Sequence, residues 1–157
     1  MAGYERTKYE ANLDIDYAIE LHFRHVQFYK HLSGIFTLLT LLGGSTIAIT
    51  ASKLDPLIPS IIGGVVVAIS LLEVTIKPAT QAAHHADIKR RWATLLAKSI
   101  DLDLTSIDRG IAQLREIDTH VIRTLEIPAF NANLKRHGRD ELLQKTGCLE
   151  KLFGVMS

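Results

Sequence analysis

The sequence is short of cysteine, of net charge and of catalytic motifs. Its single cysteine, Cys148, can form neither an intramolecular disulfide nor a cysteine-based zinc site, which favours a reducing compartment. Lys and Arg number 18 against 17 Asp and Glu, so the total charge favours no nucleic acid, and double-stranded DNA is not an expected partner. The G-x-S-x-G, P-loop, G-x-G-x-x-G and H-E-x-x-H motifs are all missing. We therefore expect neither an enzyme nor a bound cofactor.

Hydrophobic residues make up 47% of the chain and are concentrated in two runs. The first run, Leu32 to Ser52, has no charged residue. As a helix it would reach roughly 31 Å, close to the thickness of the hydrocarbon core of a bilayer. The second run, Leu57 to Ile76, contains one acid, Glu73, near its end, and Lys53–Pro56 separates the two runs. Each run is long enough to span a membrane.

A buried helical hairpin in a soluble α-helical protein is the alternative to a transmembrane hairpin. A helix that is apolar all round belongs in lipid or in the centre of a large protein. A chain of 157 residues is too small to enclose two such helices on every side. The sequence therefore predicts a transmembrane hairpin over 32–77.

The basic residues around the hairpin predict its orientation in the membrane. The loop between the two runs has only Lys53, whereas the segments at the inner ends carry Arg24, Lys30, Lys77, Lys89, Arg90 and Arg91. Because positive residues are retained on the cytoplasmic side, we expect both termini in the cytoplasm and the Lys53–Pro56 turn outside. The protein would then be a multi-pass membrane protein.

Outside the hairpin, the pattern predicts helices alone, so the expected fold class is all-α. An N-terminal cytoplasmic helix occupies Tyr4–Lys30 within segment 1–31, and a cytoplasmic helical region fills 78–157. This region begins with a helix over Ala79–Leu102, whose Trp92 we expect to pack against the N-terminal helix.

A further helix is predicted between residue 105 and Pro128, with Thr105 or Ser106 as its cap. Its apolar face would consist of Ile107, Ile111, Leu114, Val121 and Leu125. In the tail we expect one short helix over Asp140–Lys145.

Glu73 is the one acid in the second apolar run, and burying it in lipid is costly. It could form a ring at the inner mouth of a pore, or pair with Lys77 four residues further along the helix. The first run carries small and hydroxyl side chains on one helix face at Ser33, Thr37, Thr40 and Gly44. This stripe could be a helix–helix seam, the wall of a water-filled pore, or hydroxyls bonded to their own helix.

Two helices cannot enclose a pore, so a channel would require several copies of the chain around an axis. The doublets Gly43-Gly44 and Gly63-Gly64 lie near the middle of their runs and permit close helix approach, within the hairpin or between subunits. We expect a cyclic homo-oligomer, with Thr37, Thr40 and Gly44 beside the pore and Glu73 at its inner mouth.

Histidines and basic residues are the remaining candidates for chemistry. His22 and His25 share a helix face, and His84-His85 precede Asp87, a spacing that could hold zinc but also suits hydrogen bonds to carbonyls and acids. We expect no metal. The tail groups Asn131, Asn133, Lys135, Arg136, His137 and Arg139. Such a group could bind phosphate, with Lys135, Arg136, His137 and Arg139 as ligand-binding residues, or could be a solvated loop near anionic lipid.

The order of these features resembles the SLATT family, the two-transmembrane effector domains that accompany SMODS nucleotidyltransferases and SLOG nucleotide-sensing proteins in bacterial defence systems. The resemblance runs from Tyr17 to Leu125. It is carried by His22-Phe23-Arg24-His25, Phe28-Tyr29-Lys30-His31, Lys77-Pro78, His84-His85, Lys89-Arg90-Arg91-Trp92 and Leu95-Leu96.

This resemblance implies a pore-forming ion channel in the bacterial inner membrane that acts as an anti-phage effector. Its opening would depolarise the membrane and arrest or kill the infected cell. A nucleotide or oligonucleotide made by a partner nucleotidyltransferase would control it, and we expect a tetramer. Two other functions fit the same hairpin: a non-conducting membrane scaffold or anchor, and a holin-like protein that forms large membrane lesions.

Overall fold

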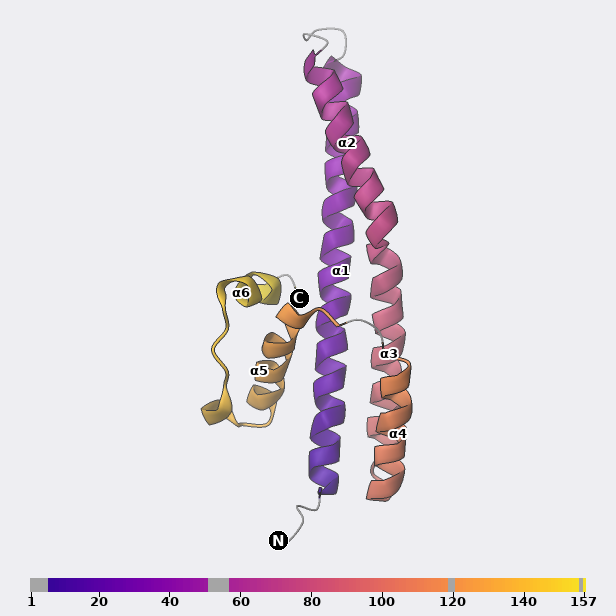
Figure 1. Ribbon diagram of the computed structural model, residues 1–157, viewed down its shortest axis with the longest axis vertical. Helices are drawn as coiled ribbons and strands as arrows, with labels where there is room; N and C mark the ends of the chain where they lie inside the picture. Colours follow the sequence, from indigo (N-terminus) through magenta and orange to yellow (C-terminus); the bar gives the residue numbers. More distant parts are fainter. Residues whose placement is uncertain (1–5, 51–56, 119–120, 156) are drawn as a thin grey trace. The chain divides into compact units, whose positions relative to one another are not determined.

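Helices account for the regular structure of the chain. The computed structural model describes residues 6–50, 57–118, 121–155 and 157, except for the side chains of residues 46–50 and 152. No β-strand occurs among these residues, and the predicted all-α class is confirmed (Figure 1).

The long helices come first in the chain and the short ones last. They are α1 (Lys8–Thr50), α2 (Leu57–Ile76), α3 (Pro78–Lys98), α4 (Leu104–Glu116), α5 (Glu126–Arg136) and α6 (Cys148–Val155). Two short 3₁₀ helices, η1 (Arg123–Leu125) and η2 (Asp140–Leu142), lie before and after α5. The predicted N-terminal helix and the first apolar run are therefore one continuous helix, α1. The predicted Lys53–Pro56 turn lies outside the described residues.

The chain forms two compact units. The helical unit is built from Met1–Phe28 and Ala82–Ser157, and the hairpin unit from Tyr29–Gln81. The N-terminal segment and the region after the hairpin, which were predicted as separate parts of the chain, thus belong to one unit.

In the hairpin unit, α1 and α2 pack closely at Gly43. A Cβ atom added to Gly43 would lie 2.3 Å from Cγ2 of Val66, so only glycine fits at this approach. At Gly44, by contrast, an added Cβ would have no neighbour within 4 Å. Of the two predicted doublets, Gly43 thus makes a close helix approach within the hairpin, whereas Gly44 and Gly64 have no neighbour within 4 Å of an added Cβ.

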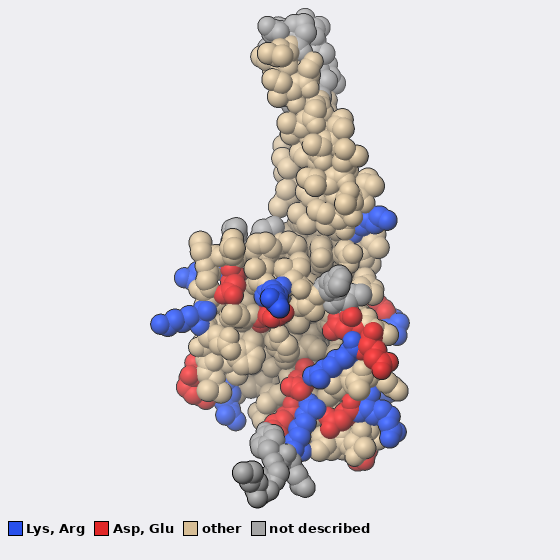
Figure 2. All heavy atoms as spheres, viewed as in Figure 1, with Lys and Arg blue, Asp and Glu red and all other residues tan. Residues whose placement is uncertain are grey.

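Exposed apolar side chains occur along the whole length of α2. None of its residues is buried. The helical stretch Leu57–Lys98 contains an 18-residue window of mean hydropathy 2.2, none of it buried, and it is the one helix among the described residues that is long and apolar enough to cross a membrane. On the face drawn in Figure 2, the hairpin unit is almost free of charged side chains, whereas acids and bases are interspersed over the helical unit.

Lys77 separates α2 from α3 with a backbone φ of +50°, in the left-handed region that non-glycine residues seldom adopt. The residue before a proline is sterically hindered from continuing a helix, and Pro78 follows directly. The Lys77 N–H still donates to the Glu73 carbonyl over 2.8 Å. The chain therefore changes conformation at this point without losing that helical hydrogen bond.

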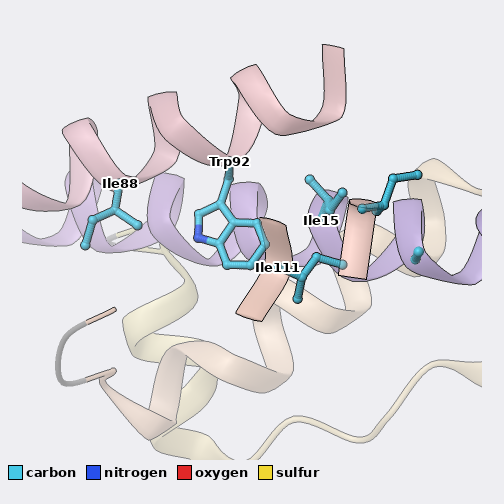
Figure 3. Close-up of a cluster of buried hydrophobic side chains, with 6 residues drawn as sticks. Ile15, Ile88, Trp92 and Ile111 are labelled. Atoms are coloured by element: carbon cyan, nitrogen blue, oxygen red, sulfur yellow. The ribbon is translucent and has the colours of Figure 1, made fainter. Parts of the chain in front are cut away.

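The core of the helical unit lies between α1, α3 and α4. Ala11 and Ile15 of α1 meet Ile88 and Trp92 of α3, and Ile107 and Ile111 of α4 complete the cluster (Figure 3). These side chains are 0–2% exposed. Trp92 thus packs against the N-terminal helix, as the sequence predicts.

A second cluster attaches the C-terminal part of the helical unit to α1. Leu21 of α1 packs with Leu125 of η1 and Ala129 of α5. The rings of Phe28 and Phe153 stack nearby with centroids 5.1 Å apart. Glu20 of α1 is buried and accepts hydrogen bonds from Arg24 and from Arg136 of α5, over 3.0 and 2.8 Å.

The single helix predicted between residue 105 and Pro128 is wrong. Helix α4 ends at Glu116, and a new helix, α5, begins at Glu126. Pro128 does not end a helix; it lies in the first turn of α5, where its missing N–H costs no helical hydrogen bond. The predicted apolar face is divided accordingly. Ile107 and Ile111 belong to the first cluster, with Leu114 packed against it, while Leu125 belongs to the second, with Val121 beside it.

The predicted caps and tail also differ from the structure. The N-cap of α4 is Asp103, which accepts a hydrogen bond from the backbone N–H of Ser106, rather than Thr105 or Ser106 itself. In the tail, the short helix predicted over Asp140–Lys145 is reduced to η2, and α6 forms where no helix was predicted.

Candidate functional site

The structure places the four predicted pore residues within the hairpin unit. Thr37 is exposed, and its hydroxyl donates to the Ser33 carbonyl over 3.0 Å, the bond to its own helix that was one of the alternatives. Thr40 is half-buried, and its buried Oγ1 has no hydrogen-bond partner among the described residues. Gly44 is exposed.

Glu73 is half-buried and Lys77 is exposed. Both residues belong to the part of the chain that the structure describes, and no ion pair joins their side chains there. The left-handed backbone of Lys77 takes it out of the regular helix that a pair four residues apart requires. The Glu73–Lys77 pair, one of the two alternatives for this acid, is therefore not formed among the described ion pairs.

A cavity of about 810 Å³ opens in the helical unit, large enough for a small organic ligand. Tyr9, Leu13, Asp14 and Tyr17 contribute one wall from α1. The rest of the lining includes Trp92 of α3, Arg115 of α4, Asp118, Phe130, Asn133, Leu134, His137, Arg139 and Leu142.

Two side chains of the cavity are buried with an unused hydrogen-bonding atom. Trp92 is 2% exposed, and its Nε1–H donor has no partner among the described residues. Asn133 is 6% exposed; its Nδ2 donates to the Leu13 carbonyl over 3.3 Å, while its Oδ1 acceptor has no partner there. Buried polar atoms in native proteins are nearly always satisfied, so this donor and this acceptor are available to a ligand.

Aromatic and charged groups complete the lining. Tyr17 and Phe130 meet edge to face with ring centroids 6.2 Å apart. Burial raises the pKa of the Tyr17 hydroxyl, which therefore stays protonated and can donate a hydrogen bond. Arg115 and Arg139 add two positive charges to the lining. The guanidinium of Arg115 lies 3.7 Å from the carboxylate of Asp14.

Only half of the predicted ligand-binding group reaches this cavity. His137 and Arg139 line it, whereas Lys135 and Arg136 do not. Arg136 instead donates to Glu20, and Lys135 is exposed. The chain turns at Gly138, whose φ of +66° suits the end of a helix, and the Arg139 N–H donates to the Leu134 carbonyl over 2.9 Å. This turn brings Arg139 to the cavity.

The amides of the tail group have different partners. Asn131 fastens the tail by a two-way hydrogen bond with the backbone of Gln144, over 2.8 and 2.9 Å. Asn133 is the amide that lines the cavity. The sequence reasoning missed the α1 wall, although Leu13 and Tyr17 lie on the apolar stripe of this helix and so signal its buried face.

Three of the histidines singled out in the sequence form a buried cluster between α1 and α3. His22, His25 and His85 are 0–1% exposed. The Nδ1 atoms of His22 and His85 are 3.0 Å apart, and the rings of His25 and His85 have centroids 4.5 Å apart. Asp118, which lines the cavity, lies 3.3 Å from Nε2 of His22. The histidines thus contact one another and an acid, and the described hydrogen bonds do not include one from Nε2 of His22.

The cluster offers few free nitrogen ligands. Nδ1 of His25 donates to the Leu21 carbonyl over 2.8 Å, and Nε2 accepts from the Ile122 N–H over 2.8 Å. Both nitrogens of this ring are therefore occupied. No group of three or more His, Cys, Asp or Glu residues suited to a metal ion occurs among the described residues.

Comparison of the chain with protein-family models, with curated proteins and with solved structures finds no match. The resemblance to the SLATT family therefore rests on the sequence pattern alone, and the functional argument on the residues described above.

Proposed function

We propose that the chain is a subunit of a ligand-gated ion channel in the bacterial inner membrane that acts as a pore-forming effector of anti-phage defence. The observation that carries the proposal is the exposure of α2, a 20-residue apolar helix with no buried residue. An apolar surface of this extent is unstable in water and fits the interior of a bilayer. The distribution of basic residues supports a multi-pass arrangement with both termini in the cytoplasm.

A pore built from this hairpin needs several copies of the chain, and we propose a tetramer. The Thr40 hydroxyl, buried without a described partner, suits a position that is hydrated or bonded to a neighbouring subunit in the assembly. Thr37 and Gly44 would line the same wall. Glu73, half-buried and without an ion pair to Lys77, would form a ring at the inner mouth and favour cations.

The cavity of the helical unit is the proposed site of the gating ligand. A nucleotide suits its chemistry because the base can stack against aromatic walls and bond to the Trp92 donor and the Asn133 acceptor. Its phosphate would bind Arg139, with His137 beside it. A partner nucleotidyltransferase would supply this nucleotide or an oligonucleotide.

A flux assay separates the channel from its two alternatives. Purified protein in liposomes should release potassium and retain calcein once the gating nucleotide is added. Release of calcein would favour the holin-like lesion. Retention of both solutes with every nucleotide tested would favour the scaffold.

Ligand binding can be measured separately, because Trp92 is the only tryptophan of the chain. Ribonucleoside monophosphates and dinucleotides are titrated while the emission of Trp92 is recorded. We expect saturable binding that Arg139→Ala weakens about tenfold or more and that the exposed-site control Lys135→Ala leaves unchanged. Equal effects of the two substitutions, or no response to any of these probes, would contradict the proposed site.

A further inference from the structure

The contact between α1 and α3, called the seam below, changes from apolar side chains to histidines along the two helices. At one end, Ile15 of α1 packs with Trp92 of α3. Seven residues further along α1 stands His22, and seven residues back along α3 stands His85, both on the same helix faces as their apolar counterparts. The histidines therefore occupy the end of the α1–α3 contact that is nearer in sequence to the hairpin unit.

The hydrogen bonds of this cluster limit the number of protons that its rings can hold. His25 uses one nitrogen as a donor to Leu21 and the other as an acceptor from Ile122, which is the arrangement of a neutral imidazole. The facing Nδ1 atoms of His22 and His85 can share one hydrogen atom, whereas two protons would set donor against donor. A further proton on the accepting Nδ1 atom therefore breaks this hydrogen bond between the two helices.

The charged and titratable groups around the cluster oppose protonation more than they favour it. His22 and His25 come from α1, His84 and His85 from α3, and Asp118 from the segment after α4. Burial and the neighbouring histidines lower the pKa of His85 to about 3, and burial, assisted by His22, lowers that of His25. Asp118 acts in the opposite direction but does not outweigh them.

We propose that the His22–His25–His85 cluster is a proton-sensitive latch that holds α1 to α3 at neutral pH and releases it when the cytoplasm turns acidic. The unfolded or released segments bind protons at the ordinary histidine pKa of about 6.5. The buried His25 and His85 rings bind them only at lower pH, so the stability of the closed seam decreases as the pH falls from about 6.5 toward 3. Because both latched helices lead into the hairpin unit, this release would act on the proposed pore as well as on the cavity that Asp118 lines.

The test is a pH titration of Trp92 emission in the full-length protein in nanodiscs, because Trp92 lies in the same seam and reports its opening. For the wild type we expect a cooperative red shift between pH 6.5 and pH 4. In His85→Leu the midpoint should move down by about one pH unit or more, because a charge can no longer be forced into this position. His31→Gln is the matched control: this histidine is exposed and lies outside the cluster, and the midpoint should stay where it is.

If His85→Leu does not show the native emission at pH 8, His25→Gln serves in its place, since its amide cannot titrate. The proposal is overturned if the wild type shows no transition above pH 4, or if the native-like variant keeps the wild-type midpoint. This readout does not depend on ion conduction, so it stands or falls separately from the proposed channel.

Discussion

Gly43 and Gly44 are identical neighbours in the sequence and have opposite surroundings in the hairpin unit. Gly43 faces Val66, and Gly44 has open space. A glycine doublet in an apolar run indicates a close helix approach. It does not indicate which of the two residues makes it, because that depends on the rotation of each helix about its axis. Residue patterns thus predicted the contact, and the structure assigns it.

Gly43→Ala should destabilise the hairpin by about 1–3 kcal/mol, because the new methyl group would overlap a branched valine side chain that has few alternative rotamers. Gly44→Ala is the matched control and should change the stability little. The measurement is unfolding of the purified protein by SDS in mixed micelles, followed by circular dichroism. Equal midpoints for the two variants would show that the close approach at Gly43 is absent.

The basic group of the tail shows the same limit. Lys135, Arg136, His137 and Arg139 share a chemistry that suits phosphate, and the sequence offers no reason to separate them. The turn at Gly138 directs Arg139 toward the cavity, while Arg136 contacts the buried carboxylate of Glu20. Arg136 is held away from the cavity by a residue 116 positions earlier in the chain, and the spacing of the basic residues does not indicate such a contact.

At the scale of elements, long segments with a clear apolar pattern were predicted well. The apolar runs and the charged helices on either side of them have one dominant period, and α1, α2 and α3 follow it. The region after α4 misled the prediction, because Val121 and Leu125 continue the helical spacing of Ile111 and Leu114 through a break that contains neither glycine nor proline. Packing against two separate clusters, rather than local propensity, ends this helix.

Ile111 and Ile117 allow the docking of α4 to be tested with the same substitution at two positions. Ile111 is 2% exposed in the core, and Ile117, just beyond the helix, is 44% exposed. Ile111→Ala should lower the free energy of unfolding by about 2–5 kcal/mol because it leaves a cavity. Ile117→Ala should change it by less than about 0.5 kcal/mol. Urea unfolding, monitored by the emission of Trp92, measures both, and a comparable loss for the two variants would contradict the observed end of α4.

For the whole molecule, the distribution of charge matters more than its near-zero sum. Between Leu32 and Ile76 the only charged residues are Lys53, Asp55 and Glu73, and the other charges lie in the two flanking segments. This division predicted the hairpin from the sequence. The cavity and the histidine cluster could not be predicted in the same way. Each depends on contacts between residues of α1 and residues that follow the hairpin in the sequence.

Cys148, the only cysteine and an exposed one, permits a direct test of the proposed orientation. A membrane-impermeant maleimide should leave Cys148 unlabelled in intact spheroplasts and label it in inverted membrane vesicles, because we place the C-terminal region in the cytoplasm. In a Cys148→Ser background, Ser52→Cys should react in the opposite way. Labelling of Cys148 from the outside would reverse the proposed topology.

If the hairpin conducts ions past a ring of Glu73, as we propose, the current should be selective for cations. The measurement is the current of the purified protein in a planar bilayer under a potassium chloride gradient, with the gating nucleotide present. We predict a reversal potential displaced toward the potassium equilibrium potential for the wild type, and displaced much less for Glu73→Gln, because an acidic ring favours cations. Absence of current under all nucleotides would contradict the channel, and an unchanged reversal potential in Glu73→Gln would contradict the ring.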